Sequence, residues 1–168
     1  MRRRILLIII IILIAIQFIR PAKNQSNDAL TSDISHVYTV PQNVSVILKK
    51  ACNDCHTNNT VYPWYAQIQP VAWWLNHHIE EGKDELNFNE FGAYAVPRQY
   101  HKLEEVVEQV KEGEMPIWSY TLIHTNAKLT DEEKQTLINW AQGIRNTMKA
   151  KYPADSLVIK RRPEAGRE

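Results

Sequence analysis

The feature that most constrains this chain is the stretch Cys52-Asn53-Asp54-Cys55-His56, which holds both of its cysteines. It follows a segment whose apolar residues recur with helical spacing, namely Val44, Ile47, Leu48 and Ala51. At the end of a helix, positions i, i+3 and i+4 project toward one side. Cys52, Cys55 and His56 can therefore reach the same flat ligand, with two sulfurs at its edge and an imidazole at its centre.

These five residues match C-x-x-C-H, the attachment signature of c-type haem. We therefore predict one covalently attached haem c, held by Cys52 and Cys55, with His56 as an axial ligand of the iron. Other interpretations of the cysteine pair are a thioredoxin-like redox pair, half of a zinc site and a simple disulfide. The redox pair needs a βαβ context, and the zinc site needs a second cysteine pair; the sequence indicates neither. A disulfide is compatible with an exported chain.

The second axial ligand is predicted to be Met115, in the loop Gly113-Glu114-Met115-Pro116. A haem that shuttles electrons has both axial positions filled, and methionine raises its potential. His78 is the alternative, because it falls on the apolar face of a helix expected to begin at Pro70. The competing interpretations are ordinary ones: a methionine that fills a gap in the core, and a histidine hydrogen-bonded within it.

The chain begins with Met1-Arg2-Arg3-Arg4 and an apolar run over residues 5–19 that only Gln17 interrupts. A positive cluster before an apolar run is typical of a targeting segment. Residues 1–20 are therefore predicted to be a signal anchor or signal peptide. We favour an uncleaved anchor that enters the membrane through residues 5–19, because no small-residue cleavage site follows. Its arginines are expected on the cytoplasmic side.

The rest of the chain divides by composition. Residues 21–40 are polar and predicted to be a flexible tether, residues 41–152 a c-type haem-binding domain, and residues 153–168 a polar tail. Four stretches in the domain show helical spacing and none alternates with period two, so the fold class is predicted to be all-α. The helix signals are Asn43 and Pro70 at two starts, Gly113 at one end, and a capping box over residues 130–133. Acidic side chains outnumber basic ones beyond residue 20, so no nucleic acid partner is expected.

Three motifs give the chain a resemblance to known proteins. They are Cys-Asn-Asp-Cys-His at 52–56, Gly-Glu-Met-Pro at 113–116, and the stretch from Leu129 to Trp140. With them, residues 41–152 resemble a cytochrome c-type haem-binding domain. The Asn-Asp-Cys-His-Thr-Asn stretch and the following Tyr-Pro-Trp-Tyr make it more narrowly similar to small membrane-anchored bacterial haem-binding domain proteins. The resemblance implies a cytochrome c-like fold of about four helices around one haem, with thioether links at Cys52 and Cys55, His56 as proximal ligand and Met115 as distal ligand.

These observations predict a membrane-anchored monohaem c-type cytochrome-like protein that transfers single electrons and is not an enzyme. It is expected at the bacterial inner membrane, with its soluble domain in the periplasm. Expected partners are redox proteins at the membrane and the cytochrome c maturation machinery. One alternative is a peroxide-handling haem enzyme or gas sensor with an open distal site, in which His78 acts on the bound molecule. Another is a haem-free interaction module with a Cys52–Cys55 disulfide.

Overall fold

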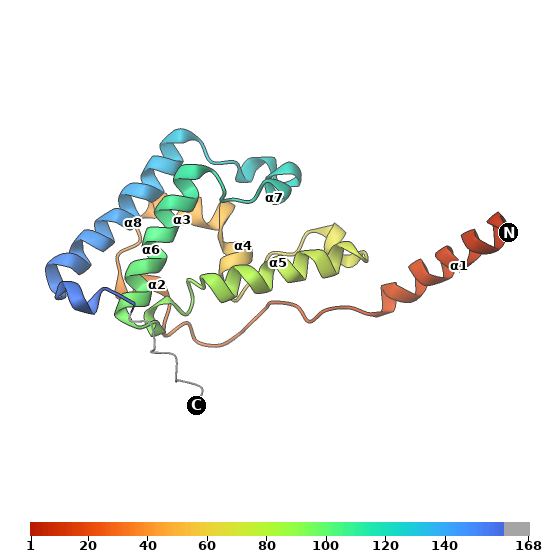
Figure 1. Ribbon diagram of the computed structural model, residues 1–168, viewed down its shortest axis with the longest axis horizontal. Coiled ribbons are helices and arrows are strands. Elements are labelled where there is room, and N and C mark those ends of the chain that lie inside the picture. Colours follow the sequence, from red (N-terminus) through yellow and green to blue (C-terminus); the bar gives the residue numbers. More distant parts are fainter. Residues whose placement is uncertain (160–168) are drawn as a thin grey trace, which may run out of the picture. The chain divides into compact units, whose positions relative to one another are not determined.

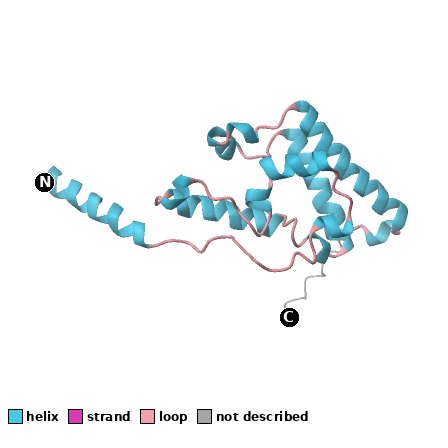
Figure 2. Cartoon of the chain, turned by 180° about the vertical axis from the view of Figure 1, so that it is seen from behind, coloured by secondary structure: helices cyan, strands magenta, loops and turns pink. Residues whose placement is uncertain are grey.

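The computed structural model describes residues 1–159, and all regular secondary structure in that part of the chain is helical (Figure 2). Within those residues, β-pairing is confined to one isolated bridge between Gln25 and Asn59. The predicted all-α fold class is therefore confirmed. The predicted polar tail, 153–168, begins with a short 3-10 turn at Ala154–Ser156, and its residues 160–168 lie outside the described part.

The chain forms two compact units, and each is built from two separate stretches of sequence. Unit 1 contains residues 1–29 and 53–88, and unit 2 contains residues 30–52 and the chain from residue 89 onward. This division differs from the single domain predicted over 41–152, and one boundary falls between Cys52 and Asn53. The physical reason is that residues after Cys52 form contacts with residues before 30, as in the hydrogen bond from Asn24 Nδ2 to the Thr57 carbonyl (2.8 Å).

Unit 1 contains three α-helices and two 3-10 turns. They are α1 (Arg2–Ala15), η1 (Ile16–Phe18), α4 (Asn53–His56), η2 (Trp64–Gln67) and α5 (Val71–Glu85). The start of α5 agrees with the predicted helix after Pro70, which is the N-terminal flanking residue. Leu75 and Ile79 of this helix are buried, whereas Trp74 is 42% exposed.

Helix α1 exposes apolar side chains around its whole circumference. Its isoleucines and leucines are between 46% and 64% exposed, and none of its residues is buried. Residues 5–16 offer no polar face that could be turned to water. Among residues 1–159, no helix reaches the length and apolarity needed to cross a membrane.

Unit 2 is larger and is built around two long helices. Its elements are α2 (Ile34–Val37), α3 (Gln42–Ala51), η3 (Phe91–Ala93), α6 (Val96–Glu112), α7 (Trp118–Ile123), η4 (Thr125–Ala127), α8 (Asp131–Lys151) and η5 (Ala154–Ser156). Helix α3 buries its four predicted apolar positions, and α8 buries Leu137, Ala141 and Ile144. Gly113 ends α6 with φ of +79°, the left-handed conformation that glycine adopts without strain.

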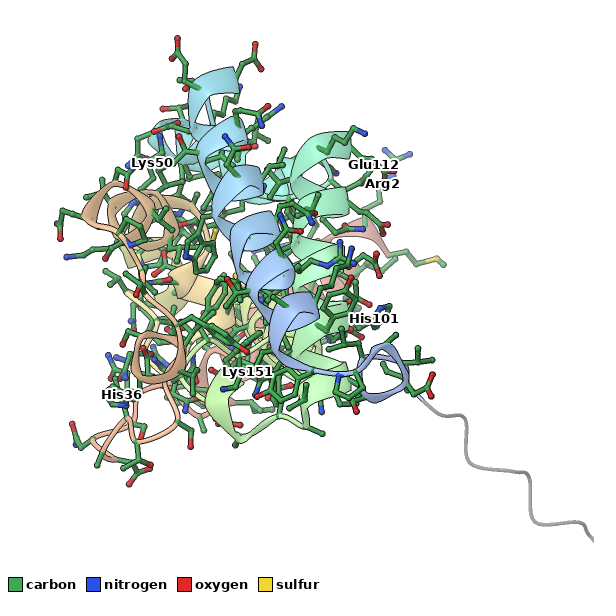
Figure 3. The ribbon with its side chains drawn as sticks, turned by 90° about the vertical axis from the view of Figure 1, so that its left-hand side faces the viewer. Arg2, His36, Lys50, His101, Glu112 and Lys151 are labelled. Carbon is green, nitrogen blue, oxygen red and sulfur yellow. The ribbon has the colours of Figure 1, made fainter. Side chains whose placement is uncertain are left out.

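Helices α6 and α8 lie side by side in opposite directions (Figure 1). His101 of α6 and Lys151 of α8 therefore lie toward one end of the helix pair, and Glu112 lies at the other (Figure 3). The buried Arg145 of α8 joins the two helices, because it pairs with Glu104 and its guanidinium lies 4.4 Å from the centre of the Tyr100 ring. Helices α6 and α8 are thus joined by an ion pair between a buried arginine and a partly exposed glutamate.

Residues 21–40 are more ordered than the predicted tether. They include α2, where Asp33 accepts a hydrogen bond from the Ser35 amide (2.9 Å) and Ile34 is buried. The Tyr38 hydroxyl donates to the Gln99 side chain (2.7 Å), which holds the end of this stretch on unit 2. The composition did not indicate this attachment, because the bond between Tyr38 and Gln99 joins residues 61 positions apart in the sequence.

The capping box predicted for the last helix is present. Thr130 Oγ1 accepts from the Glu133 amide (3.2 Å), and the Glu133 carboxylate accepts from the Thr130 amide (2.9 Å). Glu133 also pairs with Lys50 of α3. The cap therefore fixes both the start of α8 and the carboxylate that holds α3.

Removal of the cap tests this arrangement. We expect Thr130→Ala to lower the free energy of unfolding by about 1 kcal/mol, because the Glu133 amide loses its acceptor. Thr147→Ala is the matched control, since Thr147 is exposed within the same helix and bonds only the Gly143 carbonyl (3.0 Å). Urea unfolding followed by far-ultraviolet circular dichroism measures both. Equal losses in the two variants would contradict a special role for the cap.

Candidate functional site

The three residues of the C-x-x-C-H motif lie at the junction of two helices. Cys52 is the residue at which α3 ends, and its amide donates to the Leu48 carbonyl (2.9 Å). Cys55 and His56 belong to the one-turn helix α4. The backbone leaves helical geometry at Cys52, where φ is −124° and ψ is −41°, so the motif is not part of one continuous helix. All three side chains are half-buried.

The imidazole of His56 is oriented by the backbone of the segment that follows α5. Its Nδ1 lies 2.9 Å from the carbonyl oxygen of Leu86. A carbonyl oxygen only accepts, so Nδ1 carries the proton and donates. In the neutral imidazole, Nε2 then carries the lone pair that can bind a metal. This tautomer is the one that an axial iron ligand requires.

The same segment holds His56 at two further points. The Phe88 amide donates to the His56 carbonyl (2.8 Å), so the backbone of this residue is paired as well. The rings of Phe88 and His56 meet edge to face with their centres 6.2 Å apart. Phe88 is 4% exposed, so one side of the imidazole lies against the apolar interior of unit 1. The ring is therefore fixed in both position and rotation.

Helix α5 approaches the Cys55 backbone closely at Gly82. A methyl group at this position would lie 2.9 Å from the Cys55 carbonyl oxygen and 3.1 Å from its Cβ. Only a residue without a side chain leaves room for the two backbones. Burial beside α5, together with the charge of Asp54, raises the pKa of the Cys55 thiol to about 11. The side chain is therefore a protonated thiol at neutral pH.

Polar residues just after the motif close α4 into a compact loop. Thr57 Oγ1 donates to the Asn53 carbonyl (2.6 Å), and Thr60 Oγ1 donates to the Asp54 carbonyl (2.6 Å). The Asp54 carboxylate accepts from the Val61 amide (3.1 Å). These bonds satisfy the ends of a helix that is too short to stabilise itself. They also explain why threonines follow the motif at these positions.

Asn24 ties this loop to the chain that follows the N-terminal helix. Its side-chain amide donates to the Thr57 carbonyl (2.8 Å) and to Thr60 Oγ1 (2.9 Å). Its side-chain oxygen accepts from the Lys83 ammonium (2.8 Å), and its backbone amide donates to the Tyr62 hydroxyl (2.7 Å). Asn24 thus joins residues 57–62 to helix α5. No motif in the sequence indicated this role, because its partners lie more than thirty residues away.

The two candidates for the second axial position lie in different units. Met115, in unit 2, is half-buried, and its amide donates to the Gln109 carbonyl (3.2 Å) just after Gly113. His78, in unit 1, lies edge-on to Trp74 with ring centres 4.5 Å apart, and its Nδ1 is 3.5 Å from the Glu81 carboxylate. Because Met115 and His56 belong to separate units, ligation by Met115 stays a prediction.

The donor set of the motif suits a porphyrin. Cys55 offers a thiol, Cys52 lies three residues before it, and His56 presents a defined nitrogen lone pair. Among residues 1–159, no three His, Cys, Asp or Glu side chains are grouped so that they could hold a single metal ion. A thiol pair with one oriented imidazole fits a ligand that brings its own four equatorial nitrogens, as haem does.

The close approach at Gly82 can be tested by adding one methyl group. We expect Gly82→Ala to lower the free energy of unfolding by about 1–3 kcal/mol, because α5 must move away from Cys55. Gly143→Ala is the matched control, since a methyl group there meets nothing within 4 Å. That variant should gain up to about 1 kcal/mol from helix propensity. Urea unfolding of both proteins provides the comparison, and a gain in both would contradict the tight contact.

Comparison with known proteins agrees with this site. No curated protein and no solved structure matches the chain. The sequence profile of a family described as haem-binding domain matches residues 11–143, which include parts of both units, the motif and Met115. The match begins at residue 11, within α1. The chain therefore belongs to the haem-binding domain family.

Proposed function

We propose that this protein is a membrane-anchored, monohaem, c-type cytochrome-like electron carrier. Cys52 and Cys55 would hold one haem through thioether bonds, and His56 would bind its iron. Met115 is the proposed distal ligand, with His78 as the alternative. Family membership supports haem binding. The covalent link, the second ligand and the transfer of electrons are the parts that we add.

The observation that carries the proposal is the hydrogen bond between His56 Nδ1 and the Leu86 carbonyl (2.9 Å). It selects the imidazole tautomer that can bind iron, and it makes the remaining nitrogen a better donor. His56 lies four residues after Cys52 and directly after Cys55. This is the position at which a haem attached by both sulfurs needs its ligand.

The haem would supply one-electron chemistry between ferrous and ferric iron. The protein's contribution is to hold the axial ligand still and to limit water around it. Phe88 lies against His56, and the close contact of α5 at Gly82 covers Cys55. An electron carrier requires that the axial ligands of its iron move little during electron transfer. No residue of the site is assigned a role in acid–base catalysis, so we propose an electron carrier and not an enzyme.

The proposed location is the bacterial inner membrane, with the haem-binding part in the periplasm. Helix α1 exposes apolar side chains on every side, which supports insertion into lipid. Arg2, Arg3 and Arg4 precede it, and a basic cluster favours the cytoplasmic side. The proposed partners are redox proteins at the same membrane, and the cytochrome c maturation machinery that attaches the haem.

Covalent attachment is tested in a host that exports proteins and matures c-type cytochromes. We expect the intact mass of the protein to exceed that of the polypeptide by one haem, and the haem to stay with the protein in acid and organic solvent. Cys52→Ala together with Cys55→Ala should remove the attachment. Asn53→Ala is the matched control, because it changes a side chain between the two cysteines and keeps their spacing. We expect that variant to retain its haem.

A bare polypeptide mass, in a host where a control cytochrome is fully loaded, would contradict the proposal. It would favour a haem-free interaction module. Haem that is bound but can be extracted would contradict the covalent, c-type attachment and leave haem binding intact. These two results are different, so the covalent link and haem binding are tested separately.

The distal ligand is tested by Met115→Ala. We expect haem to stay attached, the reduction potential to fall, and carbon monoxide to bind the ferrous protein rapidly, because one axial position opens. Met148→Leu is the matched control, since Met148 is a buried methionine of α8 that is 1% exposed. Its potential and its methionine-to-iron absorption band should be unchanged.

Rapid carbon monoxide binding to the wild-type protein would contradict a fixed distal ligand. It would favour the open site of a gas sensor or peroxide-handling enzyme. An unchanged methionine-to-iron band in Met115→Ala would assign the distal ligand to another methionine.

A further inference from the structure

We propose that unit 1 has a second membrane contact, an aromatic patch that lies in the lipid headgroup region beside α1. The patch consists of Trp64, Ile68, Trp73 and Trp74, in and after η2 and in the first turn of α5. The inference rests on the proposed anchoring by α1 and adds a surface to it. Its ligand is a phospholipid bilayer.

The patch exposes an unusual amount of apolar side chain. Trp64 is 78% exposed, Ile68 45%, Trp74 42% and Trp73 36%. Tryptophan gains a large apolar contact when it is covered, so three tryptophans and Ile68 in and beside two neighbouring elements are costly to expose to water. Tryptophan is also enriched at the boundary between lipid and water, where its ring is apolar and its N–H stays hydrogen-bonded.

The patch is tied to the end of the apolar N-terminal segment by Gln17. The Gln17 side chain accepts from the Gln69 amide (2.9 Å) and donates to the Gln69 carbonyl (3.2 Å). The Gln17 side chain therefore binds both the backbone N–H and the backbone carbonyl of Gln69, the two groups that a neighbouring β-strand would bind. Gln69 lies directly after Ile68 and is 3% exposed, so this contact is enclosed.

Three further bonds hold the two segments together. The Gln69 side chain donates to the Ile19 carbonyl (2.8 Å), and the Trp73 indole N–H donates to the same oxygen (3.0 Å). Arg20 donates to the Gln67 side chain (2.9 Å). The polar edge of Trp73 thus faces the chain that leaves α1. When α1 is in the membrane, these bonds hold the patch at the level where the apolar segment ends.

This arrangement also accounts for Gln17, the polar residue that interrupts the apolar run. In a continuous membrane helix a glutamine would be costly. At the lipid–water boundary it can pair with Gln69 and tie the end of the apolar segment to the residues before α5. A protein partner on the patch would not require this link to α1. The bonds between residues 17–20 and 67–73 therefore favour lipid as the occupant.

The test measures the access of water to the patch in vesicles. The full-length, haem-loaded protein is reconstituted into vesicles of phosphatidylethanolamine and phosphatidylglycerol. A charged, water-soluble maleimide then alkylates Ile68→Cys, and the rate is compared with Glu85→Cys at the far end of α5. Helix α5 has 15 residues and is about 22 Å long, so Glu85 at its end lies away from the patch. In loaded protein the native cysteines are in thioethers, and a Cys52→Ser/Cys55→Ser background serves if haem is absent.

We expect alkylation of Ile68→Cys to be about tenfold slower than that of Glu85→Cys, a ratio that corresponds to about 1.4 kcal/mol of preference for the covered state. Trp64→Gln with Trp74→Gln should restore the faster rate, because the patch then loses its apolar surface. Equal rates at the two positions in vesicles would overturn the proposal. A slow rate that the tryptophan substitutions do not change would also overturn it, since another element or a protein would then cover residue 68.

The outcome is separable from the proposed function. Flotation with the vesicles reports whether α1 anchors the protein, and the mass of the protein reports the haem. Protein that floats, carries haem and reacts equally at both positions refutes the patch alone. Protein that does not float refutes the anchoring on which the patch rests.

Discussion

The hydrogen bond from His56 Nδ1 to the Leu86 carbonyl is the contact on which the proposed haem site depends (2.9 Å). It requires that the backbone after α5 return to α4, and two other features make that return possible. Gly82 lets the backbones of the two helices approach, and Phe88 pairs with His56 through both its amide and its ring. A site built in this way has its ligand oriented before any cofactor arrives, so binding costs less ordering of the protein.

Local signals in the sequence predicted local structure well. The capping box at Thr130 and Glu133 and the glycine that ends α6 both appear as expected, because each acts through residues three or four positions apart. The buried faces of α3 and α8 follow from helical spacing for the same reason. The motif itself was recognisable because its chemistry is held in five consecutive residues. Membership of the haem-binding family confirms that interpretation at the level of haem binding.

The remaining features depend on contacts that carry no sequence signature. A backbone carbonyl such as that of Leu86 is the same for every residue type, so no pattern marks it as the partner of His56. Asn24 looked like part of a polar tether, and its five hydrogen bonds join it to residues more than thirty positions away. The division of the chain inside the motif has the same origin, since it reflects pairing between the N-terminal stretch and residues 53–88. Helical spacing alone also cannot tell an apolar interior from an apolar surface, and Trp74 of α5 is 42% exposed.

The bonds of Asn24 have a consequence for how a redox protein could meet this one. A carrier on a long, flexible linker can move far from the membrane surface. Partners whose docking sites lie at different distances from the membrane can then reach it. Here the chain between Arg20 and the motif is fastened at residue 24 to Thr57, Thr60 and Lys83, so little slack is left between the proposed anchor and the imidazole. This geometry would suit electron exchange with partner proteins that diffuse in the same bilayer. Encounters would then depend on lateral density in the bilayer more than on concentration in the surrounding fluid.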